Sequence, residues 1–323
     1  MRFFVFMRFK FWLIPIILFL LSSCKQNDEQ FTRSLVKKFK ENSIDRNKID
    51  WSIFEEKVLD KLELGRDSVI VTALTLHGQP HSFYISGNKI LKGKFKEQQR
   101  VDSCKTEETI LENPLTDVGY LWLRGFSGNL HDEEKYRNSG SLYINEIVDD
   151  IKRQDKANIK GWVIDLRSNT GGDMWPMLIA LSPFLSDGEL GYFKSDFEEQ
   201  KWSVKSNTVS ADNRSQNERV YNGNLNYKIR NGKSKIAVLI GRKTASSGEA
   251  VTIALKTLKG VRFFGQRTYG FTTSNQSFLM GANESLVITT SVMTDNKRQV
   301  YPNGIAPDEV ICNDQPLKKW FAN

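Results

Sequence analysis

Two short segments carry the residue types that acyl-transfer chemistry needs. Ser246 follows an apolar run at residues 235–240 and precedes a segment of helical composition, so it lies where a strand gives way to a helix. The N–H groups and the dipole of a helix's first turn favour negative charge that develops there, and a serine with a nearby base can then act as a nucleophile. The alternative is that Thr244, Ser246 and Ser247 only cap the helix, with Glu249 closing a capping box.

The second segment, residues 165–173, places two glycines directly after another apolar run. Paired glycines let the backbone approach a ligand closely, and their N–H groups can bind an oxyanion. We therefore predict an oxyanion hole made by the N–H groups of Gly171 or Gly172 and of Ser247. A phosphate-binding loop is excluded, because the lysine and the glycine spacing of that motif are absent from the sequence.

The elements that must position these turns alternate between apolar strands and amphipathic helices, which predicts an α/β core of βαβ units. Strands are expected at residues 118–126, 161–166 and 235–240. The core is predicted to span 118–323, with a polar loop or ribbon inserted at about 196–233. Before the core, apolar residues at helical spacing predict a small helical domain over 31–77, followed by a cap region over 78–117.

The first 23 residues have the features of a signal peptide. Basic residues precede an apolar run, residues 11–21, that is shorter than the ~20 residues of a typical transmembrane helix. The segment Leu21-Ser22-Ser23-Cys24 resembles the bacterial lipobox, so we expect Cys24 to carry a lipid and residues 24–30 to form a tether. The alternatives are an uncleaved anchor and an ordinary secretory signal. In every case the rest of the chain is expected in the bacterial cell envelope, on the periplasmic or the surface-exposed side.

Charge and cysteine content narrow the range of partners. The net charge of +8 falls to +5 without residues 1–23, and the basic side chains are interleaved with acidic ones, which argues against nucleic acid as a partner. The three histidines have no zinc-ligand spacing, so neither a metal site nor a cofactor is predicted. An oxidising compartment permits a disulfide between Cys104 and Cys312, but two cysteines alone leave that pairing open.

Three segments together resemble the S41 family of serine peptidases, which includes the C-terminal processing proteases and the tricorn protease core. Residues 165–172 are similar to the family's Asp-Leu-Arg-x-Asn-x-Gly-Gly turn, residues 244–249 to its Thr/Ser-Ala-Ser-x-x-Glu segment, and residues 304–308 to a late Gly-Ile-x-Pro-Asp segment. The resemblance implies a hydrolase with a ClpP/crotonase-like core and Ser246 as its nucleophile. Ser247 remains the rival nucleophile.

The same resemblance separates two candidate bases. C-terminal processing members use a lysine that follows the serine, but the matching position here is Phe271, which cannot accept a proton. Another branch uses a histidine in a Gly-x-x-His-Ser/Thr context, and residues 78–82 match it. His81 is therefore predicted as the base. No carboxylate that would orient this histidine is evident, so the prediction is a dyad of Ser246 and His81.

Residues 162–187 and 269–276 also resemble the nisin resistance proteins, which are membrane-anchored S41 peptidases that remove the tail of a lanthipeptide antibiotic. Like them, this chain has no room for a PDZ domain, because only 36 residues separate His81 from Val118. The resemblance implies a peptide or protein substrate that enters by its C-terminus. Two alternatives stay open, namely an inactive peptide-binding lipoprotein and a general protein-processing peptidase of the envelope.

Overall fold

The computed structural model describes residues 13–96, 104, 115, 117–128, 132–232 and 234–322. The chain divides into two compact units, which are described separately. Unit 1 consists of Met1–Glu97 and Asn275–Thr290, and unit 2 consists of Gln98–Ser274 and Ser291–Asn323. Residues 275–290, which were expected in the core, join unit 1 because the first half of a long strand pairs with a strand that follows the helical segment.

Unit 1 begins with a helical segment, as predicted. Its elements are α1 (Leu13–Asn42), α2 (Trp51–Leu59), the 3-10 helix η1 (Leu62–Leu64) and α3 (Arg66–His77). Phe31, Leu35 and Phe39, spaced four residues apart, are all buried in one hydrophobic cluster. Asp50 caps α2 by accepting the N–H groups of Ser52 and Ile53. α1 also contains residues 24–30, the predicted tether, and therefore includes Cys24.

The strands of unit 1 form an antiparallel sheet next to these helices. They are β1 (Phe83–Ser86), β2 (Lys89–Lys92), β11 (Thr273–Gly281) and the first part of β12 (Glu284–Asp295). β1 lies between β2 and β12, with Phe83 opposite Val287, and β11 pairs with β12. β1 and β2 form a hairpin within the segment expected as a cap region, and the pairing of β1 with β12 joins segments about 200 residues apart.

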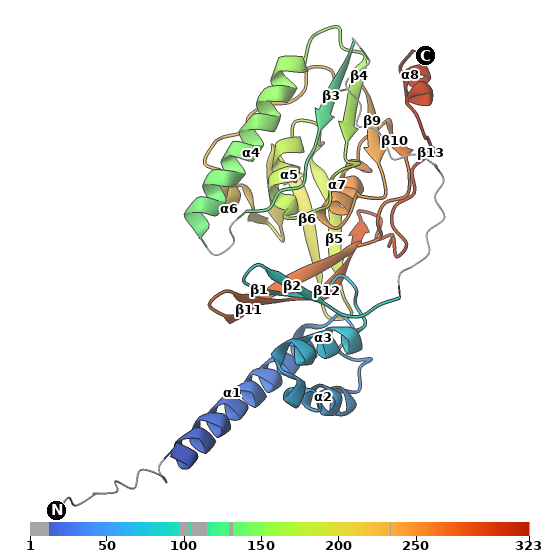
Figure 1. The fold of residues 1–323 in the computed structure, drawn as a ribbon. Coiled ribbons are helices and arrows are strands. Elements are labelled where there is room, and N and C mark those ends of the chain that lie inside the picture. The colour runs from blue at the N-terminus through green and yellow to red at the C-terminus, as the bar shows by residue number, and fades with distance from the viewer. Residues whose placement is uncertain are drawn as a thin grey trace, which may run out of the picture. The chain divides into compact units, whose positions relative to one another are not determined.

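Unit 2 is built on the parallel sheet that the apolar runs predict. The strand order is β13-β10-β9-β4-β3. The strands are β3 (Val118–Trp122), β4 (Gly161–Asp165), β9 (Lys235–Ile240), β10 (Val261–Gly265) and β13 (Glu309–Val310), and the helices packed on them are α4 (Glu133–Gln154), α5 (Met174–Leu181), α7 (Ser247–Leu255) and α8 (Gln315–Ala322). Figure 1 shows α4 and α8 on opposite sides of this sheet. The inner strands β4 and β9 are buried on both faces, which explains why their sequences are largely apolar.

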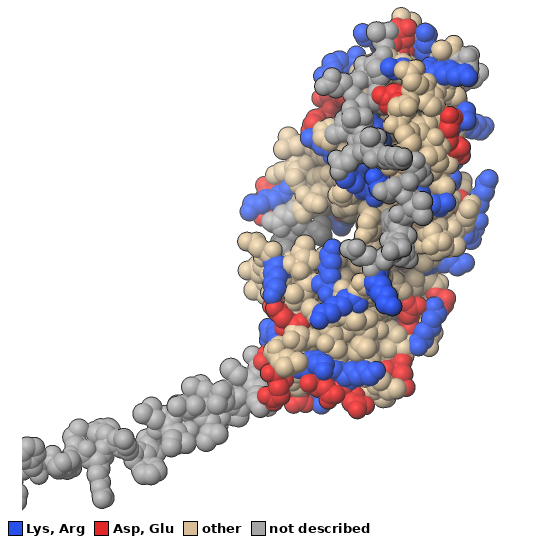
Figure 2. Space-filling view, turned by 45° about the vertical axis from the view of Figure 1, so that its right-hand side comes forward, with Lys and Arg blue, Asp and Glu red and all other residues tan. Residues whose placement is uncertain are grey.

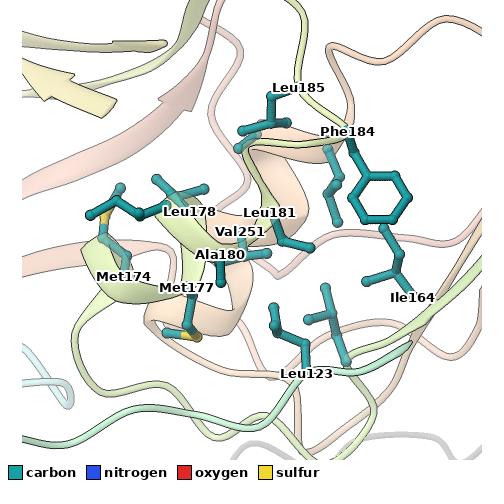
Figure 3. Packing of buried hydrophobic residues seen from close by; sticks show 14 of the residues in the cluster. Leu123, Ile164, Met174, Met177, Leu178, Ala180, Leu181, Phe184, Leu185 and Val251 are labelled. Atoms are coloured by element: carbon teal, nitrogen blue, oxygen red, sulfur yellow. The ribbon is translucent and has the colours of Figure 1, made fainter. Parts of the chain in front are cut away.

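The core of unit 2 has two layers. Trp162 and Ile164 contribute to the cluster that includes α4, α5 and α7, whereas Val163, between them in the chain, contributes to the cluster with α8. This is the alternation expected of a strand with helices on both faces. Figure 3 shows the first layer at close range, where Leu181 and Phe184 lie near Ile164. α5 is apolar on almost every side because it is buried between its neighbours.

An antiparallel ribbon begins just before the predicted polar insertion and occupies its first half. Its strands are β5 (Gly188–Lys194), β6 (Glu199–Lys205), β7 (Thr208–Ala211) and β8 (Arg214–Ser215), followed by the short helix α6 (Asn217–Val220). β5 pairs with the second part of β12. The segment 196–233, for which a loop or ribbon was expected, forms strands in its first half, and the alternating burial of β6 and β7 shows that the ribbon packs one face inward.

Cys104 and Cys312 form a disulfide within unit 2, which answers the question that the sequence left open. None of the helices in the described part of the chain is long and apolar enough to cross a membrane. On the face drawn in Figure 2, basic and acidic side chains lie interspersed, so the positive net charge is not gathered into one patch on that face.

Candidate active site

Ser246 occupies a strained position between β9 and α7. Its backbone has φ 54° and ψ −120°, a conformation that side-chain-bearing residues rarely adopt. Such strain costs on the order of 1–3 kcal/mol and persists only where the surroundings enforce it. Because the turn is sharp, the residue at its apex projects from the carboxyl edge of the sheet, and Ser246 remains half-exposed.

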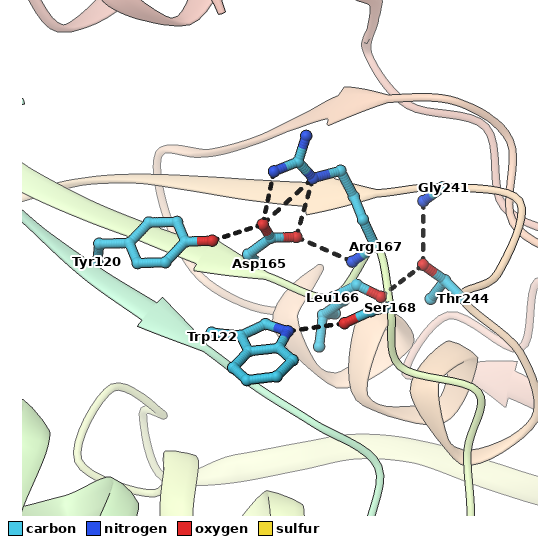
Figure 4. Close-up of polar contacts among 8 residues, drawn as sticks. All are labelled: Tyr120, Trp122, Asp165, Leu166, Arg167, Ser168, Gly241 and Thr244. Atoms are coloured by element: carbon cyan, nitrogen blue, oxygen red, sulfur yellow. Dashed lines mark hydrogen bonds and ion pairs between the residues drawn. The ribbon is translucent and has the colours of Figure 1, made fainter. Parts of the chain in front are cut away.

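Thr244 fixes the turn from the strand side. Its Oγ1 accepts the N–H of Gly241 at 3.0 Å and donates to the carbonyl of Leu166 at 2.8 Å (Figure 4). The side chain is fully buried, and both of its bonds run to backbone groups. It therefore ties the turn after β9 to the turn after β4.

Glu249 fixes the same turn from the helix side. Its carboxylate accepts the N–H of Ser246 at 3.0 Å, the hydroxyl of Thr268 at 2.5 Å and the N–H of Gly270 at 2.7 Å. Burial raises the pKa of Glu249 above its ordinary value, although these hydrogen bonds act in the opposite direction. The predicted capping box is therefore present, and its acidic member also holds the segment around Phe271.

The segment at residues 304–308 is connected to the hydrogen bonds of Glu249 through Thr268. The Thr268 Oγ1 accepts the N–H of Ile305 at 2.7 Å, and the Thr268 N–H donates to the Ile305 carbonyl at 3.1 Å. Asp308 accepts the N–H of Phe263 at 2.8 Å. The three segments that carry the family resemblance are thus brought together in unit 2.

The glycine turn lies directly against Ser246. Gly171 has φ 103° and Gly172 has φ 117°, and a Cβ on Gly171 would lie 2.8 Å from the Cβ of Ser246. A Cβ on Gly172 would overlap the carbonyl oxygen of Phe126. Both positions therefore require glycine for conformation and for space.

Hydrogen bonds to Asn169 determine which backbone N–H groups near Ser246 already have an acceptor. Its Oδ1 accepts the N–H of Gly171 at 3.0 Å, and its carbonyl accepts the N–H of Ala245 at 3.0 Å. Within the part of the chain that the structure describes, the N–H groups of Gly172 and Ser247 have no acceptor. Two unpaired donors next to a serine can stabilise an oxyanion.

Ser247, the rival nucleophile, is engaged differently from Ser246. Its hydroxyl donates to the carbonyl of Gly172 at 2.6 Å, and the side chain is buried. The bond links the first turn of α7 to the glycine turn. The Ser247 hydroxyl thus donates its proton to a backbone carbonyl, whereas the half-exposed Ser246 side chain acts as an acceptor in the capping box and keeps its proton available.

An ion pair stiffens the end of β4. Asp165 is almost fully buried and binds the guanidinium of Arg167 at 2.7 Å, while the Tyr120 hydroxyl donates to it at 2.7 Å (Figure 4). Burial and the neighbouring Asp165 carboxylate raise the pKa of Tyr120, which therefore keeps its proton. The first residues of the motif at 165–172 thus anchor the turn, and its last residues approach Ser246.

Asp173 ends the glycine turn and begins α5. Its side chain accepts the N–H of Trp175 at 2.9 Å, is hydrogen-bonded by the Tyr136 hydroxyl, and forms an ion pair with Arg219 at 3.2 Å. Arg219 comes from α6, so the polar insertion contributes a contact to the residue next to Gly172. This contact could not be predicted from the sequence, since no local pattern links residues 173 and 219.

His81 lies in unit 1, in the loop between α3 and β1, and its side chain is half-buried. Its carbonyl accepts the side-chain amide of Asn275 at 2.9 Å. His77 is instead buried at the end of α3 and contacts Ser43 at 2.8 Å, and burial lowers the pKa of His77 to about 4. His131 lies outside the described residues. Ser246 and His81 therefore belong to different units.

Phe271, at the position of the lysine in C-terminal processing members, packs on an aromatic neighbour. Its ring lies 4.4 Å from that of Tyr269, centroid to centroid, at an angle of 65°. The Tyr269 N–H donates to the Thr244 carbonyl at 2.8 Å, so the pair is held beside the Ser246 turn through the backbone. In the described residues, no group of His, Cys, Asp and Glu side chains is arranged to hold a metal ion.

A serine held at a strained apex between a strand and a helix, beside unpaired N–H groups, is typical of hydrolases that use its hydroxyl. The model of peptidase family S41 matches residues 117–311, and the chain belongs to this family. The fold class and the family resemblance predicted from the sequence are therefore confirmed.

Relatives of known name agree with this assignment. The nisin-resistance protein of Lactococcus lactis subsp. lactis is 26% identical over 292 residues, which cover 87% of this chain and 82% of that protein. A carboxy-terminal-processing protease of Bartonella bacilliformis is 29% identical over 206 residues, which cover 64% of this chain but only 41% of that protease.

Solved structures share the fold. A lipoprotein from Streptococcus agalactiae aligns with a TM-score of 0.69 at 21% identity, covering 91% of this chain and 96% of that one. The photosystem II D1 C-terminal processing protease aligns with a TM-score of 0.52 at 12% identity, covering 88% and 93%. These likenesses concern the fold alone.

Proposed function

We propose that the protein is a serine peptidase of the bacterial cell envelope that cleaves a peptide or protein near its C-terminus, with Ser246 as nucleophile and His81 as base. The observation that carries the proposal is the strained backbone of Ser246 beside the unpaired N–H groups of Gly172 and Ser247. Strain of this kind is kept at functional sites, and a helix cap alone does not require it. Membership of family S41 supports the reaction class.

The proposed reaction is acyl transfer. His81 takes the proton of the Ser246 hydroxyl as the oxygen attacks the scissile carbonyl, and the N–H groups of Gly172 and Ser247 hold the tetrahedral oxyanion. His81 then protonates the departing amine. A water molecule, with His81 again as base, hydrolyses the acyl-enzyme. Gly171 is assigned a packing role instead of a donor role, because its N–H is bonded to Asn169.

The choice of Ser246 over Ser247 rests on their hydroxyl groups. The Ser247 hydroxyl is committed to the Gly172 carbonyl and buried, so using it would break a bond that ties the two turns together. Ser246 is half-exposed, and its own N–H is anchored by Glu249. The anchoring fixes the backbone and leaves the side chain accessible.

Labelling with a fluorophosphonate tests the nucleophile and the base. We expect full-length protein in detergent to form a covalent adduct on Ser246, identified by intact mass and peptide mapping. Ser246→Ala abolishes the adduct, and His81→Ala slows its formation by about 100-fold or more. Ser247→Ala is the matched control and should still be labelled. An adduct on Ser247, or a His81→Ala variant that reacts at the wild-type rate, would contradict the assignment.

The substrate class is proposed from the relative that aligns over most of the chain. A nisin-resistance protein among the relatives points to an antimicrobial peptide of the lanthipeptide type. Incubation with nisin should yield a peptide that lacks its C-terminal part, and Ser246→Ala should leave the peptide intact. If wild type and Ser246→Ala both retain intact nisin with equal affinity, the protein is a peptide-binding lipoprotein. The phenylalanine at position 271 favours that alternative, because the lysine of the C-terminal processing members is missing.

The anchor is a separate proposal. We propose that Cys24 carries a lipid and holds the body at a membrane surface, and the lipoprotein and nisin-resistance relatives support an envelope location. Mass spectrometry of the N-terminal peptide should show a diacylglycerol-modified Cys24 in wild type. Cys24→Ser should move the protein from the membrane fraction to the soluble fraction or leave an uncleaved precursor. Retention of residues 1–23 in the wild-type protein would argue for an uncleaved anchor instead.

A further inference from the structure

The peptide group that joins His81 to Ser82 is enclosed in a ring of hydrogen bonds. The Asn275 Nδ2 donates to the His81 carbonyl at 2.9 Å, and the Asn275 Oδ1 accepts the hydroxyl of Thr289 at 2.9 Å. The Ser82 hydroxyl lies 3.1 Å from the Thr289 Oγ1 and accepts the Thr289 N–H at 2.9 Å. The ring therefore closes through three side chains, all in unit 1.

The chemistry of the groups gives the ring a single direction. A carbonyl can only accept, so the nitrogen of the Asn275 amide must face His81 and its oxygen must face Thr289. The Thr289 hydroxyl then donates to Asn275 and is free to accept from Ser82, and the Ser82 hydroxyl accepts from the Thr289 N–H. Each hydroxyl of the ring donates once and accepts once.

The ring is built into the sheet of unit 1. Ser82 and Thr289 are fully buried, and Ser82 directly precedes Phe83, which lies opposite Val287 in the β1–β12 pairing. The Thr289 carbonyl is also used, because it accepts the N–H of Ile44 at 3.0 Å. Hydrogen bonds in such a dry environment are stronger than in water, and a partly satisfied set is costly.

We propose that Asn275, oriented by Thr289, is a positioning residue for His81. The inference rests on the proposed role of His81 as base. The direction of the His81 carbonyl sets the ψ angle of that residue, so the Asn275 amide fixes the backbone from which the imidazole projects. A displacement of about 1 Å in a catalytic group can cost on the order of 100-fold in rate.

The test compares rates of fluorophosphonate labelling at Ser246 in the full-length protein. Asn275→Ala should lower the labelling rate constant by about 10- to 100-fold while the final labelled fraction and the probe concentration for half-saturation stay unchanged. Partial unfolding would lower the labelled fraction instead. Asn283→Ala, the same change at an exposed position of the β11–β12 turn, is the matched control and should react like wild type.

Three further variants keep the proposal falsifiable if Asn275→Ala does not fold. Asn275→Asp retains an acceptor for Thr289 but places a carboxylate oxygen against the His81 carbonyl, so its rate should fall as in Asn275→Ala. Thr289→Ser keeps the hydroxyl and should react within about threefold of wild type, whereas Thr289→Val should lose about tenfold. The pH dependence of labelling should become flatter in the slow variants, because the contribution of His81 is lost.

The outcomes separate this inference from the proposed function. If wild type labels at Ser246, His81→Ala is slow, and Asn275→Ala and Thr289→Val both react like wild type, then the positioning role is wrong and the dyad stands. If His81→Ala reacts at the wild-type rate, then His81 is not the base and both proposals are overturned.

Discussion

The turn that carries Ser246 and the loop that carries His81 are held by different kinds of interaction. The Ser246 turn has a strained backbone, and a buried carboxylate with three donors enforces it. The ring at His81 consists of neutral amide and hydroxyl groups, and no residue of that loop other than glycine has a positive φ. The backbone strain of the Ser246 turn persists only because its surroundings enforce it, whereas the loop at His81 depends on a complete set of hydrogen bonds among neutral groups.

Gly171→Ala is expected to have the largest effect, because it changes both the stability of the Ser246 turn and the reactivity of Ser246. The new Cβ would lie 2.8 Å from the Cβ of Ser246 and would occupy a left-handed backbone conformation. We expect a loss of about 1–3 kcal/mol in the free energy of unfolding and at least about 100-fold in the rate of Ser246 labelling. Gly260→Ala has a similar positive φ but no neighbour within 4 Å, so it isolates strain from the clash. Equal labelling in the two variants would show that the contact between Gly171 and Ser246 is irrelevant to reactivity.

A second prediction concerns acid sensitivity near the His81 loop. His77 is buried and its pKa is lowered to about 4 from 6.5, so the unfolded chain binds its proton more readily than the folded unit does. Stability therefore falls as pH decreases from about 6.5 to 4, by about 3 kcal/mol in total at the conversion of 1.36 kcal/mol per pKa unit. Urea denaturation of wild type and His77→Gln should show this slope in wild type alone. A parallel slope in both proteins would assign the acid sensitivity to other groups.

The smallest expected effect concerns Glu249 in the Ser246 turn. Its contribution to stability changes with pH in the direction opposite to that of His77. Burial raises the pKa of Glu249 above 4.5, so the folded state holds its proton more tightly than the unfolded chain. Its contribution to stability is complete at low pH and is lost as pH rises through the folded-state pKa. The difference in unfolding free energy between wild type and Glu249→Gln should therefore decrease on going from pH 4 to pH 7. A constant difference over this range would mean that the hydrogen bonds to the carboxylate fully offset its burial.

Sequence patterns predict the Ser246 site better than the His81 site, and the reason is physical. The glycines at 171 and 172 and the pattern from 244 to 249 are local signals of backbone geometry, so the turns could be located before their contacts were known. Which N–H groups remain unpaired could not be predicted, because it depends on the rotamer of Asn169. Continuous apolar runs likewise identify β4 and β9 as buried parallel strands.

No local sequence pattern identifies the residues that hold the His81 loop in place. Asn275 lies in β11, which is partly exposed, and Thr289 lies in β12, which is mostly buried. Their bonds to the His81 loop span 194 and 207 residues. Contacts of this range follow from the pairing of β1 with β12, which neither strand specifies alone. The same holds for the link between Asp173 and Arg219 and for the division that places residues 275–290 in unit 1.

The disulfide between Cys104 and Cys312 makes most of unit 2 a closed covalent ring. Ser246, the glycine turn and the late motif all lie inside this ring, since their positions fall between the two cysteines. A single cut in an exposed segment of the ribbon would open the ring without releasing either piece. On a denaturing gel, the cleaved protein would therefore run as one species without reductant and as two fragments after the disulfide is reduced. A single cleavage in the ribbon would thus leave the parts of the site covalently connected.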